Sequence, residues 1–145
     1  MTEIIGKCSC GVIEYQFSMT DLLAYQCHCS VCRKATGSAF STTLMVPVMS
    51  FQWLSSESSI ATYKKENEYK VSFCSMCGSP VPNMFRNFPL LSVPVGGIEN
   101  SEDIVIAAQI YLGSKAEWDM GKMTGTKYEE IPSLEKMLEI LHAEL

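Results

Sequence analysis

Arginine is scarce in this chain, and long apolar segments are missing from it. The 145 residues contain two arginines, Arg33 and Arg86, and no apolar run approaches the ~18 residues that a membrane-spanning helix requires. Acidic residues outnumber basic residues by 16 to 11, which gives a formal net charge of -5. Nucleic-acid-binding domains usually carry a basic patch, so the sequence predicts neither a nucleic-acid partner nor a membrane partner.

Charged residues make up only 19% of the chain, whereas apolar residues make up 47%. An apolar fraction of roughly 45–50% is ordinary for folded proteins, and this excludes disorder as the main state. A chain of this length predicts a single domain spanning residues 1–145. The first seven residues lack the apolar core of an export signal, so we expect a cytoplasmic location.

The most unusual feature present is a set of seven cysteines in three short groups. They are Cys8 and Cys10, then Cys27, Cys29 and Cys32, then Cys74 and Cys77. A complete set of intrachain disulfides would leave one thiol unpaired. In a cytoplasmic protein the thiols stay reduced, and clustered reduced cysteines favour metal binding or catalysis.

The pattern of the remaining residues predicts a mainly β protein with one late helix. Ile13, Tyr15 and Phe17 alternate with polar or less apolar neighbours, as in a half-buried strand. Further strands are predicted at residues 38–46, 51–54, 60–63, 69–73, 81–85, 90–95 and 104–112, with a hairpin turn near Asn67. From Ser133 to the end of the chain, leucine and methionine recur at helical spacing, and Ser133 can cap the helix.

Two cysteines with one or two residues between them can direct both thiolates at one ion from a single tight turn. Zinc suits such soft ligands and binds them in a tetrahedron at about 2.3 Å from each sulfur. Gly11 and Gly78 each follow the second cysteine of a pair, where glycine allows the positive φ that a turn around a metal needs.

Seven thiols divide naturally into four and three. Four thiolates close a structural zinc site, whereas three leave one position open, as in catalytic zinc sites. The spacing leaves two partitions open. One joins Cys8, Cys10, Cys74 and Cys77 and leaves Cys27, Cys29 and Cys32; the other joins Cys29, Cys32, Cys74 and Cys77 and leaves Cys8, Cys10 and Cys27.

The two histidines are not expected to complete either site. His28 lies between two cysteines, and in an extended segment its side chain points away from the face that carries Cys27 and Cys29. We therefore expect a supporting or surface role for it. His142 lies in the predicted terminal helix, far from every cysteine group, and is expected to be solvated.

Four segments together resemble the glutathione-dependent formaldehyde-activating enzyme family, which also contains centromere protein V-like proteins. They are residues 6–11 (GKCSCG), 27–37 (CHCSVCRKATG), 73–80 (FCSMCGSP) and 114–118 (SKAEW). The resemblance extends from about Gly6 to Pro132. Gln109 stands where members of the family often carry a histidine, so the chain departs from the family pattern at this position.

The resemblance implies a β-tent fold of antiparallel sheets with two zinc ions per chain. It assigns a structural zinc to Cys8, Cys10, Cys74 and Cys77, and a second, labile zinc to Cys27, Cys29 and Cys32. It also implies a carbon–sulfur lyase that promotes the condensation of glutathione with formaldehyde to S-hydroxymethylglutathione.

The chemistry of three thiolates on zinc points in the same direction. Such a group carries a formal charge of -1, so it is a poor activator of water but a suitable place to bind a substrate thiol. Arg33 and Lys34 follow Cys32 and can attract an anionic thiol such as glutathione. The sequence thus predicts an enzyme acting on a glutathione or other thiol adduct of a small aldehyde. The alternative is a binding module in which both metals are structural.

Overall fold

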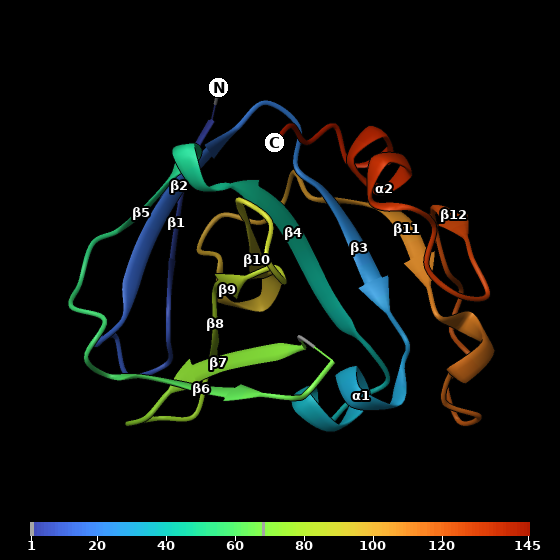
Figure 1. Ribbon diagram of the computed structural model, residues 1–145, viewed down its shortest axis with the longest axis horizontal. Coiled ribbons are helices and arrows are strands. Elements are labelled where there is room, and N and C mark those ends of the chain that lie inside the picture. The colour runs from blue at the N-terminus through green and yellow to red at the C-terminus, as the bar shows by residue number, and fades with distance from the viewer. Residues whose placement is uncertain (1, 68) are drawn as a thin grey trace.

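The computed structural model describes residues 2–67 and 69–145, which form three β-sheets and two short α-helices (Figure 1). The strands are β1 (Thr2–Lys7), β2 (Glu14–Met19), β3 (Leu23–Cys27), β4 (Ser41–Pro47), β5 (Phe51–Trp53), β6 (Ile60–Lys64), β7 (Lys70–Cys74), β8 (Pro80–Val81), β9 (Asn83–Met84), β10 (Leu90–Pro94), β11 (Val105–Ile110) and β12 (Thr126–Lys127). The helices are α1 (Ser30–Thr36) and α2 (Leu134–Ile140), with 3-10 turns η1 (Val48–Ser50), η2 (Val95–Gly97) and η3 (Leu112–Ser114). Neither described α-helix has the length and apolar character needed to cross a bilayer.

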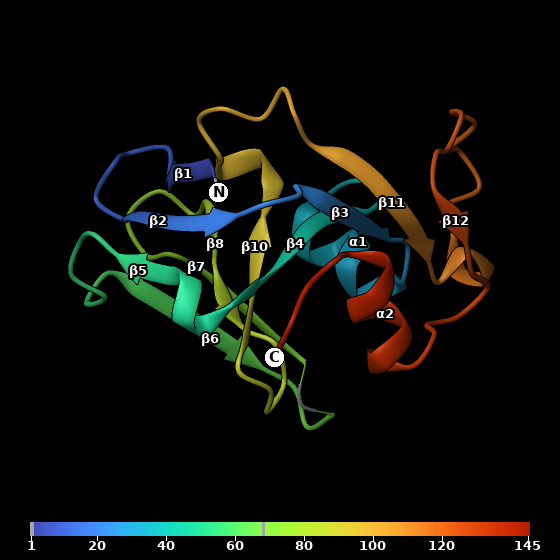
Figure 2. The same ribbon diagram turned by 90° about the horizontal axis from the view of Figure 1, so that it is seen from above.

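The three sheets are arranged like the sides and base of a tent. Their strand orders are β1-β2-β5, β12-β11-β3-β4-β10-β9 and β6-β7-β8. In Figure 1 the first sheet and the β3–β4 pair approach each other at the top and spread apart downward, while the β6–β7 hairpin crosses the open base. Figure 2 shows α2 beside the six-stranded sheet, outside the space between the sheets. The fold is therefore mainly β with a short C-terminal helix, as the sequence predicts.

Alternating burial along β2 makes one wall of the core. Tyr15 and Phe17 are buried, whereas Gln16 between them is only half-buried, which confirms the period of two seen in the sequence. These side chains pack with Leu44 and Val93 of the six-stranded sheet. Burying each such side chain contributes about 1.5–3 kcal/mol, so this cluster holds two sides of the tent together.

Two sequence expectations need correction. Residues 81–85 do not form one strand: β8 pairs with β7 and β9 pairs with β10, which belong to different sheets. Pro82 lies between them and has no N–H to donate, so the ladder breaks there and the chain crosses between sheets. Two of the sheets are antiparallel, as expected, whereas the six-stranded sheet is mixed, because β11 pairs in parallel with β3 and β12 after a long connection.

The terminal helix begins as predicted but is shorter than expected. Ser133 Oγ accepts a hydrogen bond from the Lys136 amide at 3.2 Å, which caps α2. The helix ends at Ile140 rather than at the chain terminus, and His142 adopts a left-handed φ of 53° just beyond it. His142 is exposed, and its Nδ1 lies 2.8 Å from Asp21 Oδ2, so the prediction of a solvated histidine is confirmed.

The ring of Tyr15 lies directly over Gly6, its cross-strand partner. A Cβ atom added to Gly6 would come within 2.3 Å of Tyr15 Cζ. The ring cannot easily move away, because Phe51 stacks on it at 5.6 Å between centroids and Trp53 meets it edge-on at 5.9 Å. Position 6 therefore requires glycine because the Tyr15 ring leaves no room for a Cβ atom, and not because of its backbone conformation.

Gly6→Ala is expected to lower the free energy of unfolding by about 1–3 kcal/mol, as overpacking of a filled core usually does. Gly96→Ala is the matched control, since an added Cβ there meets no atom within 4 Å, and we expect a change within about 0.5 kcal/mol. Denaturant unfolding of both variants measures the difference. Equal stabilities would show that the Tyr15 ring is free to shift.

Candidate metal centres and the cavity that joins them

Two turns from distant parts of the chain bring four cysteines together. Cys8 and Cys10 lie in the turn after β1, Cys74 ends β7, and Cys77 lies in the turn that follows it. Gly11 has a φ of 81° and Gly78 a φ of 78°. The expectation of positive φ after each cysteine pair is therefore confirmed, and glycine permits it without strain.

The spacing of these four sulfur atoms fits a tetrahedral metal site. Cys8 Sγ lies 3.7 Å from Cys10 Sγ, which lies 3.8 Å from Cys74 Sγ. A tetrahedron with metal–sulfur bonds of about 2.3 Å has edges of about 3.8 Å. Backbone amides also point at the sulfurs: Ile13 N–H donates to Cys8 Sγ at 3.3 Å, and Met76 N–H donates to Cys74 Sγ at 3.4 Å. Such donors stabilise thiolates.

The second group consists of Cys27, Cys29 and Cys32, whose sulfur atoms all lie within 4.8 Å of one another. Cys27 ends β3, Cys29 precedes α1, and Cys32 lies in its first turn. Cys29 Sγ accepts the Cys32 amide at 3.3 Å and so caps the helix. Hydrogen bonds from the Cys27 and Cys32 thiols lower the pKa of Cys29. The pKa of Cys27 is raised by its contacts with the Cys29 and Cys32 thiols and by burial.

The grouping follows the first of the two partitions that the spacing allowed. Among the described residues, the structure brings Cys8, Cys10, Cys74 and Cys77 to one place and Cys27, Cys29 and Cys32 to another. The partition that mixed Cys29 and Cys32 with Cys74 and Cys77 is not formed. Each group can hold a metal ion, and their thiol ligands are those that zinc accepts.

His28 belongs to a buried polar chain rather than to the surface. It is fully buried, and its Nε2 lies 2.6 Å from Gln109 Oε1. Gln109 Nε2 donates in turn to Gln26 Oε1 at 2.8 Å and to the Thr124 carbonyl at 3.1 Å. Because both amide hydrogens of Gln109 are used, its Oε1 must accept, and His28 carries its proton on Nε2. These hydrogen bonds hold the segment between Cys27 and Cys29 against β11.

His28 therefore points away from the cysteines, as predicted, but a surface position for it is wrong. Sequence analysis did not identify Gln109 as its partner, because the two residues are brought together by the parallel pairing of β3 and β11, with Gln109 opposite Gln26. A glutamine inside an apolar strand was the available signal, since buried amides need partners.

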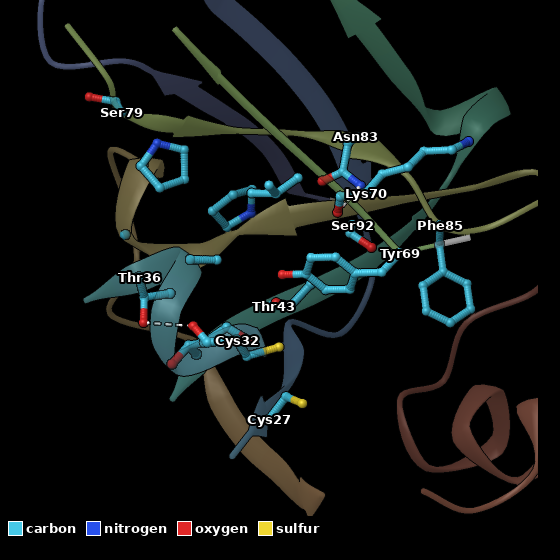
Figure 3. Close-up of a pocket in the computed structure, with 18 of the residues that line it drawn as sticks. Cys27, Cys32, Thr36, Thr43, Tyr69, Lys70, Ser79, Asn83, Phe85 and Ser92 are labelled. Carbon is cyan, nitrogen blue, oxygen red and sulfur yellow. Dashed lines mark hydrogen bonds between the residues drawn. The ribbon is translucent and has the colours of Figure 1, made fainter. Parts of the chain in front are cut away.

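A cavity of about 1210 Å³ lies between the sheets, and residues of both cysteine groups line it. Ligand pockets for small molecules usually occupy ~300–1000 Å³, so this space accommodates a small peptide or metabolite. Figure 3 shows Cys27 and Cys32 at this pocket together with Thr43, Tyr69 and Ser92. Thr36 Oγ1 donates to the Cys32 carbonyl at 3.0 Å and so helps to close α1.

Three tyrosines around the three-cysteine group were not found by sequence reasoning. Tyr25, Tyr69 and Tyr111 all line the cavity. Burial and the neighbouring sulfur atoms raise the pKa of each, so their hydroxyls keep their protons at neutral pH. They lie on separate strands and loops, with no shared motif that the sequence could reveal.

The charged residues of the cavity also differ from those that the sequence suggested. Arg33 and Lys34 lie on α1 and are not among the lining residues, whereas Lys70 and Arg86 are. The role predicted for Arg33 and Lys34 stays a prediction. Trp118, from the 114–118 segment, is 67% exposed and does not line the cavity either.

These features define a mainly β protein with two cysteine groups that can each hold a metal ion. The model of the glutathione-dependent formaldehyde-activating enzyme family matches residues 3–114, and the chain belongs to that family. The fold is also similar to a crystal structure of a Rhodobacter sphaeroides protein from a structural genomics programme. The two share 20% sequence identity and a TM-score of 0.58, over 86% of this chain and 98% of that one.

Cys74→Ser is expected to destabilise the protein far more than Cys29→Ser. Metal binding at a closed four-thiolate site is coupled to folding and is worth of order 10 kcal/mol, whereas the three-cysteine group is expected to hold its metal less tightly. Thermal midpoints and metal content of the zinc-loaded variants measure this. Two zinc ions per chain are expected in the parent protein, one removed quickly by a chelator. Equal losses for both variants would contradict the division into structural and labile sites.

Gln109→Leu is expected to cost about 2–3 kcal/mol of stability, because it leaves the buried His28 N–H without an acceptor. Gln52→Leu is the matched control: Gln52 is exposed, and among the described residues its side chain bonds only to Gln16 across the sheet, so the change should stay within about 0.5 kcal/mol. The denaturant midpoints of the two variants measure these changes in stability. A tolerated leucine at position 109 would mean that His28 finds another partner.

Proposed function

We propose that the protein is a carbon–sulfur lyase-type enzyme that uses zinc at Cys27, Cys29 and Cys32 to act on a thiol and a small aldehyde. The observation that carries this proposal is that only three thiols form this group and that they line a cavity able to hold a tripeptide. When bound there, zinc would supply a coordination position at which a substrate thiol loses its proton near neutral pH. Glutathione or another small thiol is the proposed co-substrate.

The proposed reaction joins the thiol sulfur to the carbonyl carbon of the aldehyde. The thiol loses one proton and the carbonyl oxygen gains one, so the sum is a simple addition that runs equally in reverse as a lyase reaction. The residues around the cysteines must therefore hold the aldehyde oxygen and provide a proton at that atom.

Tyr69 is the side chain best placed to do this. Burial and the neighbouring Cys32 thiol raise the pKa of its hydroxyl, and Figure 3 shows the phenol pointing into the cavity. Because burial raises the pKa of Tyr69, the hydroxyl is protonated and can donate to a carbonyl or alkoxide oxygen. Thr43 and Ser92 add further hydroxyl groups to the same cavity.

The four-cysteine group has a different proposed role. Its four thiols complete a tetrahedral coordination sphere without a substrate, so it serves the fold. Arg33 and Lys34 are proposed to act at longer range: Lys34 is exposed and Arg33 half-buried, and their charges favour the approach of anionic thiols to α1.

Glutathione is expected to change the thiolate charge-transfer band of the cobalt-substituted protein, because its sulfur would join the three cysteines. S-methylglutathione lacks the thiol and should leave the band unchanged. Arg33→Ala combined with Lys34→Ala should weaken the glutathione effect more at low salt than at high salt, since exposed charges are screened beyond ~10 Å at 0.1 M.

Two results would contradict the proposal. If millimolar glutathione and other small thiols leave the band unchanged, or if the methylated analogue shifts it equally, thiol capture fails. The better account would then be a binding module with two structural metals.

A further inference from the structure

The lysine, arginine and glutamate side chains that line the cavity carry a net positive charge, although the chain as a whole is acidic. Among the residues that the structure describes, four with charged side chains line it: Lys7, Lys70, Arg86 and Glu99. They sum to +2, against a formal net charge of -5 for the chain. Lys7 and Glu99 face each other at 3.9 Å and offset one another. The remaining excess charge belongs to Lys70 and Arg86, and no ion pair joins either of them to a described acidic residue.

A hydrogen bond joins Lys70, at the start of β7, to Arg86, just after β9. Lys70 begins β7, directly after Tyr69, and its Nζ donates to the Arg86 carbonyl at 3.5 Å. Asn83 Nδ2 donates to the Lys70 carbonyl at 3.3 Å, which connects the start of β7 to β9. These bonds hold the Lys70 ammonium group beside the Arg86 loop, and in Figure 3 the Lys70 side chain extends away from the Tyr69 hydroxyl.

The Arg86 backbone and side chain are both held in specific positions. Its φ of 50° lies in the left-handed region, which costs a non-glycine residue about 1–2 kcal/mol. Its guanidinium lies over the Phe85 ring, with Cζ 5.3 Å from the ring centre. Phe85 in turn stacks on Phe88 at 6.1 Å, which fixes the ring.

Arg86 and the three-cysteine group line one cavity, and Tyr111 lines it with them. A ligand whose sulfur meets the cysteines can therefore extend along this cavity toward Arg86.

We infer that Lys70 and Arg86 form a subsite for a carboxylate of the thiol substrate, at a distance from its sulfur, and thereby select acidic thiols over neutral ones. A guanidinium offers two parallel N–H donors that match a carboxylate, and the ammonium adds a second charge. The inference deepens the proposed function and rests on it for the sulfur end of the ligand.

Glutathione and its diethyl ester test the subsite, because they share the thiol and differ in the two carboxylates. With the cobalt-substituted protein, glutathione is expected to bind about fivefold to tenfold more tightly than the ester. Arg86→Gln combined with Lys70→Gln should remove this preference and leave ester binding unchanged. Lys7→Gln is the matched control, since it removes a cavity cation that Glu99 already pairs, and it should keep the preference. Thermal midpoints check that each variant is folded.

A second measurement separates this inference from the proposed function. S-methylglutathione keeps both carboxylates and cannot ligate through a thiol, so its binding, followed by chemical-shift changes, should still depend on Lys70 and Arg86. If the ester shifts the cobalt band as readily as glutathione in the parent protein, the subsite is wrong while thiol capture stands. If no thiol shifts the band but S-methylglutathione binding requires the two cations, thiol capture fails and the subsite stands. Unchanged S-methylglutathione binding in the double variant overturns the subsite.

Discussion

The convergence of four sulfur atoms from two distant turns is the constraint on which the rest of the structure depends. The turn after β1 and the turn after β7 must place Cys8, Cys10, Cys74 and Cys77 within 4.8 Å of one another. Four thiolates at that spacing repel strongly in a partly buried place, so a divalent cation and the fold stabilise each other. This junction joins the first sheet to the hairpin at the base of the tent, and it fixes the space that the sheets enclose.

The three-cysteine group has a different structural basis. Its cysteines come from one short stretch of chain, from Cys27 to Cys32, so their proximity needs no distant contact. The backbone supports it instead: α1 presents its first amides to Cys29, and the buried His28–Gln109 pair anchors the loop to β11. A ligand group built locally can lose or exchange its metal without opening the tent, which is the physical reason for assigning it a labile ion.

The sequence predicted features that depend on neighbouring residues and missed those that depend on distant ones. The cysteine groups, the turn glycines, the β6–β7 hairpin and the Ser133 cap all follow from local spacing, and all are present. Parallel pairing of β3 with β11 and the Gln109 contact arise from strands far apart in sequence. Lys70 and Arg86 were missed for the same reason, because they approach each other only where β7 and β9 do. Arg33 and Lys34 were predicted instead because they directly follow a cysteine motif in the sequence. The break at Pro82 is a local feature that the strand prediction for residues 81–85 overlooked.

The two halves of the cavity divide the recognition of a substrate in a physically consistent way. Three thiolates with a divalent ion carry a net charge of -1, which would repel an anionic thiol brought close to them. Two cations farther along the wall, with no acidic partner among the described residues, offset that repulsion where the acidic end of the ligand would lie. The Arg86 guanidinium lies over the Phe85 ring, which gives that charge a fixed position on the wall. Separation of the sulfur-binding and the charge-binding residues is therefore what allows one cavity to accept a ligand that carries both groups.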